Sequence, residues 1–443
     1  MSETAIGVLA RFGANFRLED APLEVIHHAQ RALIDWHASL YPGLGMPAVK
    51  VLEATLSDEL DRGAARLATG RAATVRAAAL INATAAHAAE LDDSYREAMY
   101  HPGAATIAAA MATAQTVGAS ASEFLKAVVL GYEISTRIGM VMGREHYKYW
   151  HNTGTMGAFG AAAACASLYR LDKEEYAHSL AIAATLTSGL QQAFRLEPMV
   201  KPLHAGRAAE AGVMSAQMAH QGMRSSLDIL EGEVGIGQAM SNGPDWTDIG
   251  ATLGSVFHIT RLTFKNHVGC GHAFAAIDGA LSLQEEHGFG ADDISTVQLG
   301  VYRSTLDIAP HVDPRTPDEA KFSLHYMVAT ALTHGSVRVT AFEPARLNDP
   351  KTRSLMQRIE ASLDPEVEAA FPQRRSARVC IKLKDGTCLH RLQPDRKGDP
   401  ELPLSDKDLE GKLLELTVPV IGMSQAKNLL NRIWALNSQE AMI

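Results

Sequence analysis

The sequence MVKPLHAGRAAEAG, residues 199–212, places a lysine and a histidine three residues apart ahead of a run of small helix-forming residues. This run predicts a helix that begins near His204. Lys201 would then lie just ahead of the helix N-terminus, where free N–H groups and the helix dipole favour a bound carboxylate or phosphate. The stretch alone is equally compatible with a solvated surface lysine. The choice between this interpretation and an anion site depends on the rest of the chain.

Composition limits the classes of protein that the chain can be. Its 443 residues exceed the roughly 250–300 residues that one hydrophobic core supports, so we expect two domains. The formal net charge of −9 argues against nucleic acid and against an anionic membrane as partners, because both require a basic face. No basic region followed by an apolar core opens the chain, so we expect a cytoplasmic protein. The four cysteines contain no C-x-x-C pair, which argues against a zinc or iron–sulfur site built on cysteines.

Apolar residues at three- and four-residue spacing predict one helix after another in the first half of the chain. The expected helices are residues 22–40, 47–60, 72–91, 104–117, 122–141, 156–169 and 173–191, followed by the helix from about His204 to Gln221. Alanine is frequent in these segments, and its small side chain lets helices approach closely.

The pattern changes after about Gly254. Alternating residues predict a strand at 295–302, and two further strands at 377–383 and 387–392 flank the turn sequence Lys384-Asp385-Gly386. Helices are expected between and after these strands at 272–286, 320–333, 352–363, 408–416 and 424–436. We therefore predict a mainly α protein with a second α+β domain: a large all-helical domain from residues 1–255 and 406–443, and a smaller α+β domain at 256–405.

Several motifs occur in a fixed order along the whole chain. They are Glu90-Leu91-Asp92-Asp93-Ser94, His101-Pro102-Gly103, His151-Asn152-Thr153-Gly154-Thr155, Lys201-Pro202-Leu203-His204-Ala205-Gly206-Arg207, Gly271-His272 with Asp278, and Lys321-Phe322-Ser323-Leu324-His325-Tyr326. In this order they resemble the MmgE/PrpD family, which contains 2-methylcitrate dehydratase, cis-aconitate decarboxylase and iminodisuccinate epimerase. The resemblance implies a helical domain with a smaller α+β lid domain, in a homodimer.

The resemblance also implies a set of site residues. It assigns catalytic roles to His101, His151, Lys201, His272 and Tyr326, and substrate contacts to Glu90, Ser94 and His204. Asp93, next to the matched positions, is expected to orient a histidine or the lysine. Each of these residues also has a plain structural interpretation, as a turn residue, a helix cap or part of the core.

A metal site and a bound cofactor are not expected. His267, Cys270 and His272 are metal-binding residue types, but their spacing fits no common ligand pattern. Gly235-Ile236-Gly237 lacks the third glycine of a dinucleotide-binding loop. We therefore predict an enzyme that uses neither a metal nor an organic cofactor.

The predicted chemistry is proton abstraction next to a carboxylate of a small di- or tricarboxylate. A base removes the proton while fixed positive charge stabilises the enediolate that develops; Lys201 and His272 suit the second role, and His101 and His151 form the acid–base pair. The resemblance favours a lyase like 2-methylcitrate dehydratase. The alternatives are an epimerase of an iminodisuccinate-like dicarboxylate, a cis-aconitate decarboxylase-like enzyme, and a catalytically silent carboxylate-binding dimer.

Overall fold

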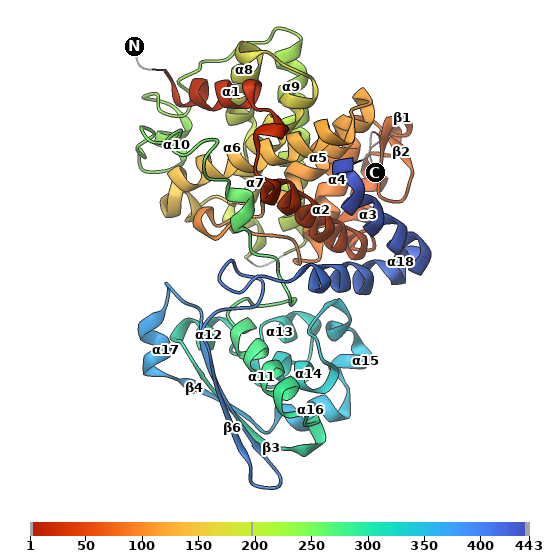
Figure 1. The fold of residues 1–443 in the computed structure, drawn as a ribbon, viewed down its shortest axis with the longest axis vertical. Helices are drawn as coiled ribbons and strands as arrows, with labels where there is room; N and C mark the ends of the chain where they lie inside the picture. The colour runs from red at the N-terminus through yellow and green to blue at the C-terminus, as the bar shows by residue number, and fades with distance from the viewer. Residues whose placement is uncertain (1–2, 196–197, 439–443) are drawn as a thin grey trace. The chain divides into compact units, whose positions relative to one another are not determined.

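The computed structural model describes residues 3–195 and 198–438. The chain divides into two compact units, residues 1–264 with 405–443, called the helical unit, and residues 265–404, called the α+β unit. The predicted fold class is confirmed, since helices dominate the first unit and a four-stranded sheet with helices forms the second (Figure 1). The first predicted boundary, after residue 255, precedes the observed one after Phe264.

The α-helices of the helical unit include the predicted ones in their order along the chain, together with α1 and α10, which are not predicted from the sequence. They are α1 (Ala5–Asn15), α2 (Leu23–Gly43), α3 (Pro47–Thr55), α4 (Val75–Ala88), α5 (Pro102–Val117), α6 (Ala121–Tyr147), α7 (Asn152–Leu168), α8 (Lys173–Leu186), α9 (Lys201–His220), α10 (Ile236–Met240) and α18 (Asp406–Ala435). In the part of the chain that the structure describes, no helix has both the length and the apolar character needed to cross a bilayer.

Helix α7 is the centre of the helical unit. Every one of its residues is buried, and it contacts α5, α6, α8 and α9 around its circumference (Figure 1). A helix buried on all sides has no polar face, and its composition of alanine and glycine fits that position. A Cβ atom at Gly160 would lie 2.4 Å from Oγ1 of Thr106 on α5. The small residues of α7 therefore set how closely its neighbours approach.

Three details of the helical unit differ from the sequence-based expectation. The helix expected at 47–60 ends at Thr55, and Leu60–Arg66 forms strand β1, which pairs with the short strand β2 (Ala72–Ala73). Helix α9 begins at Lys201 rather than near His204. Helix α18 spans both helices expected after residue 405, with a kink at Gly422, whose φ of 79° lies outside the helical region.

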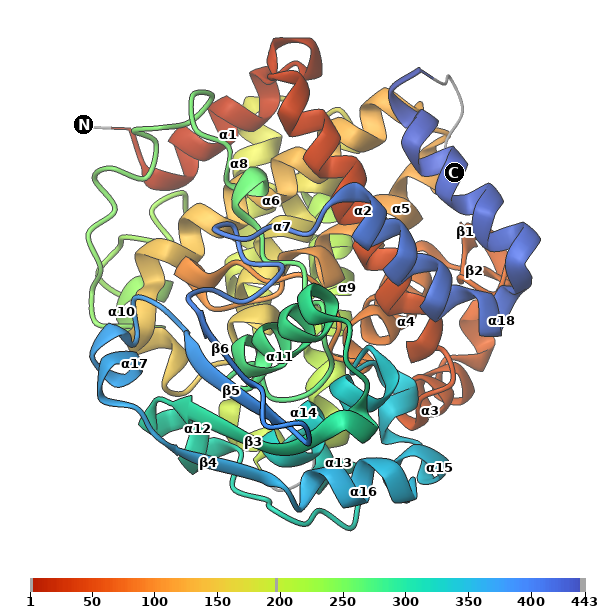
Figure 2. The same ribbon diagram turned by 60° about the horizontal axis from the view of Figure 1, so that its bottom comes forward.

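The α+β unit is built on one mixed sheet. Its strands are β3 (Ile294–Val301), β4 (Ile359–Leu363), β5 (Ala377–Leu383) and β6 (Cys388–Gln393), in the order β4-β3-β5-β6. Strand β3 runs parallel to β4 and antiparallel to β5. Helix α11 (Phe274–His287) contacts β5 and β6, and α14 (Leu324–His334) contacts β4 (Figure 2). The remaining helices are α12 (Arg303–Ile308), α13 (Pro317–Lys321), α15 (Pro344–Leu347), α16 (Pro350–Met356) and α17 (Pro365–Ala370).

The predicted hairpin is confirmed, whereas one predicted helix is wrong. Strands β5 and β6 pair through the turn at Lys384-Asp385-Gly386, and Gly386 takes a φ of 95° that favours glycine. The helix expected at 352–363 ends at Met356, and Ile359–Leu363 is strand β4. The partner of β4 is β3, which lies far earlier in the sequence, so local periodicity carries no signal for this strand.

Replacement of Gly43 tests the close packing of α2 on α4. A Cβ atom at Gly43 would lie 1.9 Å from the backbone oxygen of Ala85, so Gly43→Ala should destabilise the helical unit by about 1–3 kcal/mol. Gly411→Ala is the matched control, because a Cβ atom at this exposed position of α18 would meet no neighbour within 4 Å, and alanine there should stabilise by about 0.5–1 kcal/mol. Urea unfolding followed by circular dichroism measures both. Equal midpoints for the two variants would contradict the tight contact.

Candidate active site

The loop after α4 carries two adjacent carboxyl groups into the interior of the helical unit. Glu90 has a φ of 55°, a left-handed conformation that is unusual for a residue with a side chain. This turn redirects the backbone, and Asp92 and Asp93 are 1% and 3% exposed. Ser94 then pairs with Thr263 through two backbone hydrogen bonds of 2.9 Å. The loop is therefore held at both ends, with its acids between them.

Asp93 is surrounded by hydrogen-bond donors. Its Oδ1 accepts a bond of 3.0 Å from the backbone N–H of Gly103, and its Oδ2 lies 2.6 Å from the hydroxyl of Tyr132. A Cβ atom at Gly103 would lie 2.9 Å from this carboxyl group, so glycine makes the approach possible. Burial raises the pKa of Asp93 to about 8, and the charges of Asp35 and Asp92 act in the same direction. The carboxyl group of Asp93 therefore holds a proton at neutral pH.

Asp92 lies against two imidazole rings. Its Oδ2 accepts a hydrogen bond of 2.8 Å from Nδ1 of His87 and lies 3.5 Å from Nδ1 of His101. Nδ1 of His101 also donates to the backbone oxygen of Asp93 at 2.7 Å. Because a carbonyl oxygen only accepts, the proton of a neutral His101 ring is on Nδ1, and Nε2 carries the lone pair. His101 thus has the tautomer of a base that acts through Nε2.

His151 and His204 form a second imidazole pair. Their Nδ1 atoms lie 3.1 Å apart, so one ring donates and the other accepts. The His151 ring also stacks on the His87 ring, with centroids 5.6 Å apart. The centroid of the His87 ring lies in turn 4.9 Å from that of the His101 ring. Burial lowers the pKa of His151 well below its ordinary value, and the nearby cations add to this effect. His151 is therefore neutral at neutral pH.

Lys201 supplies the positive charge of this cluster. Lys201 is the first residue of α9. Its Nζ donates a hydrogen bond of 3.0 Å to Oε1 of Glu90 and lies 5.8 Å from the ring centroid of Phe194. Burial opposes the ammonium form, but the attraction of Glu90 and Asp92 outweighs it and raises the pKa of Lys201. The ammonium group remains charged beside neutral imidazoles, an arrangement suited to binding an anion and moving its protons.

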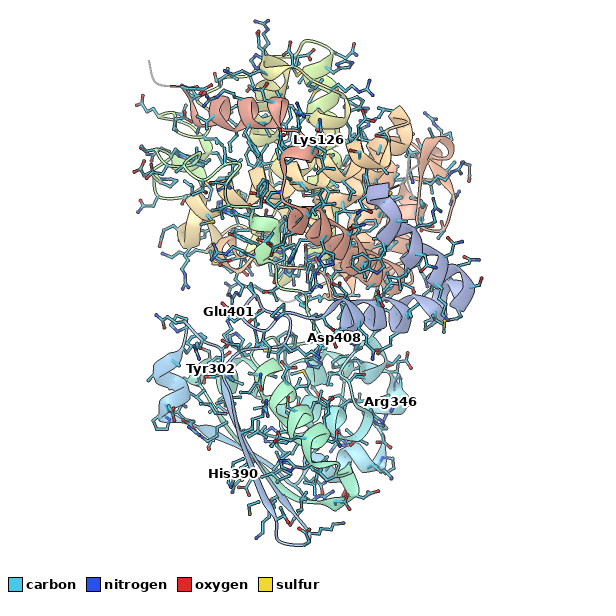
Figure 3. All side chains as sticks on the ribbon, viewed as in Figure 1. Lys126, Tyr302, Arg346, His390, Glu401 and Asp408 are labelled. Carbon is cyan, nitrogen blue, oxygen red and sulfur yellow. The ribbon has the colours of Figure 1, made fainter. Side chains whose placement is uncertain are left out.

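The two predicted residues of the α+β unit have other local partners. Nδ1 of His272 lies 2.8 Å from the hydroxyl of Tyr302, and burial, aided by Arg375 and Arg396, lowers the pKa of His272 to about 4. Tyr302 is labelled within the α+β unit in Figure 3. Tyr326 is fully buried, and its hydroxyl donates to the backbone oxygen of Ala341. This bond engages the phenol proton, and the catalytic role of Tyr326 stays a prediction.

One group of side chains has the geometry to hold a metal ion. Within the described ranges, 3–195 and 198–438, only His87, Asp92 and His101 bring three such ligand atoms within 4.8 Å of one another. Both imidazoles direct an Nδ1–H group at an oxygen, so a metal ion bound through Nδ1 would displace these protons, whereas binding through Nε2 would leave them in place. His267, by contrast, binds Asp278 through Nε2 at 2.9 Å, and it does not gather with Cys270 and His272 into such a group.

Three residues of the cluster are not predicted from the sequence. Asp92 lies within a quoted motif and His87 precedes it by five residues on α4, so their proximity along the chain is the signal that could have indicated them. Phe194 lies edge-on to the His151 ring, with centroids 5.1 Å apart. No pattern in the sequence distinguishes this phenylalanine, since its contacts come from the tertiary fold alone.

The protonation of Asp93 gives a direct test of this electrostatic arrangement. Burial is the main reason why the pKa of Asp93 is raised to about 8. Infrared difference spectra between pH values below and above 8 should therefore show the loss of a protonated-carboxyl band as Asp93 ionises. Asp93→Asn should lose the component that ionises near pH 8 and keep the component of Glu133, whose pKa burial raises to about 7. Glu133→Gln is the control, which should keep the component that ionises near pH 8. Identical spectra for wild type and Asp93→Asn would mean that Asp93 is already ionised on the acidic side.

Comparisons with known proteins agree with the order of the motifs. The MmgE/PrpD N-terminal domain model matches residues 7–249, and the MmgE/PrpD C-terminal domain model matches residues 267–437. A cis-aconitate decarboxylase of Aspergillus terreus is 24% identical over 454 residues, covering 97% of this chain and 92% of the relative. A cis-aconitate decarboxylase of Mus musculus is 27% identical over 351 residues, covering 76% and 70%. Because the two family models together span nearly the entire sequence, this chain belongs to the MmgE/PrpD family.

Proposed function

We propose that this protein is a cofactor-independent lyase that acts on a small di- or tricarboxylate by proton transfer at a carbon next to a carboxylate. The observation that carries the proposal is the charged Lys201 ammonium group beside the neutral imidazoles of His151 and His204. A carboxylate needs the cation, and a carbon acid needs the neutral base. The cis-aconitate decarboxylases among the relatives support a carboxylate substrate.

Each group has a role in this mechanism. The substrate carboxylate displaces Glu90 from Lys201 and faces the first turn of α9, whose free N–H groups favour an anion. His101 removes the proton through Nε2, and Asp92 stabilises the imidazolium ion that forms. The electron pair from the broken C–H bond moves into the carboxylate to give an enediolate, which Lys201 stabilises. The His101 imidazolium ion then delivers this proton to the leaving group or back to carbon.

The fate of the enediolate decides the reaction. Expulsion of a β-hydroxyl as water gives a dehydratase, which the motif resemblance places first. Protonation on the opposite face gives an epimerase. In a decarboxylase, loss of carbon dioxide generates the carbanion directly, and a histidine protonates it; the named relatives make this reaction the one to test beside dehydration.

Proton NMR in D₂O with a panel of polycarboxylates tests the proposal. The panel contains 2-methylcitrate, citrate, cis-aconitate, malate-type acids and iminodisuccinate, with a chelator present and no cofactor added. A new olefinic signal identifies a dehydratase, and release of carbon dioxide identifies a decarboxylase. Deuterium at the α-carbon without a new olefin identifies an epimerase. Binding of these acids without any turnover would contradict the proposal and favour the silent binding protein. The homodimer remains a prediction from the resemblance, which sedimentation equilibrium tests.

Loss of the Lys201 charge should reduce turnover without unfolding the protein. Lys201→Met is expected to lower kcat/KM by about 10²–10³-fold, the usual effect of removing one group that stabilises developing negative charge. Lys148→Met is the matched control, since Lys148 forms an exposed ion pair of 2.6 Å with Glu145. Steady-state kinetics on the identified substrate measure both. Full activity of Lys201→Met would remove the lysine from the mechanism.

Replacement of His101 separates proton transfer from substrate binding. His101→Asn should lower kcat by roughly 10²–10⁴-fold, the contribution of one positioned acid–base group, and should change substrate affinity much less. Solvent exchange of the α-proton, followed by NMR, should slow in parallel. A variant that still exchanges this proton at the wild-type rate would show that another residue is the base.

A further inference from the structure

A fully buried ion pair joins α2, near the start of the chain, to α18, near its end. Nζ of Lys412 on α18 lies 2.6 Å from Oδ1 of Asp35 on α2, and neither side chain is exposed to solvent. The two helices run side by side, in red and blue in Figure 1 and Figure 2, and further bonds connect them. Among these, Gln30 donates to the backbone oxygens of Ile433 and Trp434.

Stability alone does not account for this ion pair. Moving an ammonium and a carboxylate group out of water costs several kcal/mol per ion, and apolar residues of similar volume often give equal or greater stability. Both helices already bury apolar residues, Leu33 on α2 and Leu409 and Leu413 on α18. A second role would explain the pair, and another hydrogen bond of Lys412 indicates one.

Lys412 also holds the loop that carries the acids of the candidate active site. Its Nζ donates a hydrogen bond of 2.8 Å to the backbone oxygen of Leu91. Leu91 directly precedes Asp92 and Asp93 and follows the left-handed turn at Glu90. A buried backbone oxygen without a donor is costly, so this bond fixes where the loop enters the interior.

We propose that Lys412 and Asp35 are positioning residues of the active site, which act through the Leu91 carbonyl group and through the charge of Asp35 on Asp92 and Asp93. The proposal rests on the proposed function, because it assigns the pair to the same site. The effect of the pair passes through the loop that orients His87 and His101.

The charge of Asp35 also bears on the protonation of Asp93. Burial has the largest effect in raising the pKa of Asp93, and the negative charge of Asp35 has the second largest. The other groups that face Asp93 are Asp92 from the same loop, Tyr132 from α6, and Tyr100, His101 and the N–H of Gly103 from the segment that opens α5. The Lys412 ammonium group, from α18, acts on Asp93 in the opposite direction to Asp35, so only removal of the Asp35 charge by itself has a defined sign. Asp35→Asn should therefore lower the pKa of Asp93 and move its ionisation to lower pH.

The test replaces both members of the pair at once, so that neither charge is left buried alone. Asp35→Leu/Lys412→Met should fold, with kcat lowered roughly 10–100-fold by misplacement of the site and with KM within about threefold of wild type. The infrared titration of Asp93 should move to lower pH in Asp35→Asn, which removes the Asp35 charge alone. Lys407→Met is the matched control, because Lys407 is an exposed residue of the same helix, and it should change neither readout.

The two readouts separate this proposal from the proposed function. A folded double variant with wild-type kcat, or an Asp35→Asn variant with an unmoved Asp93 titration, would overturn the positioning role. If the wild-type protein converts none of the acids in the panel, the proposed function fails, and the titration of Asp35→Asn alone decides the effect of Asp35 on Asp93. If the double variant does not fold, Asp35→Asn/Lys412→Gln removes the same charges while keeping polar side chains, and the same loss of kcat is expected.

Discussion

The burial of two adjacent carboxyl groups, Asp92 and Asp93, is the constraint on which the candidate site depends. Unpaired carboxylates in a protein interior cost several kcal/mol each, and the structure meets this cost in two ways. Asp92 lies between the imidazoles of His87 and His101. Asp93 keeps its proton and accepts from Tyr132 and Gly103. The two buried acids thus require polar groups around them. Two of these groups are the imidazoles of His87 and His101, whose tautomers are defined by their hydrogen bonds.

Close helix packing makes this arrangement possible. Helices α5, α7 and α9 begin at or next to His101, His151 and Lys201, so that three helix starts bring their functional residues together. Alanine and glycine on these helices allow the approach, as at Gly206, where a Cβ atom would lie 2.2 Å from Oγ1 of Thr84 on α4. The small residues that indicate close helix packing in the sequence therefore also set the distances within the site.

The sequence predicts elements with a local pattern and misses those without one. The hairpin at Lys384-Asp385-Gly386 follows from turn chemistry, whereas the residues of strand β4 predict a helix, because its partner β3 lies far away in the chain. At the site, the motifs indicate the positions of His101, His151 and Lys201. They do not indicate the contacts of Phe194 or the buried pair of Asp35 and Lys412, because both arise from segments that meet only in the folded chain.

The charge states at the site follow from unequal burial and pairing rather than from residue type. Burial keeps the His151 ring neutral, yet Lys201 stays charged because Glu90 lies 3.0 Å away. Glu90 itself is exposed and lies in a left-handed turn, so in the proposed mechanism it is the partner of Lys201 that a substrate carboxylate displaces at the lowest free-energy cost. Exchange of one carboxylate for another keeps the lysine charge compensated throughout binding. It also gives an anionic substrate an advantage over a neutral one, because a neutral molecule in this position would separate the ion pair without replacing it.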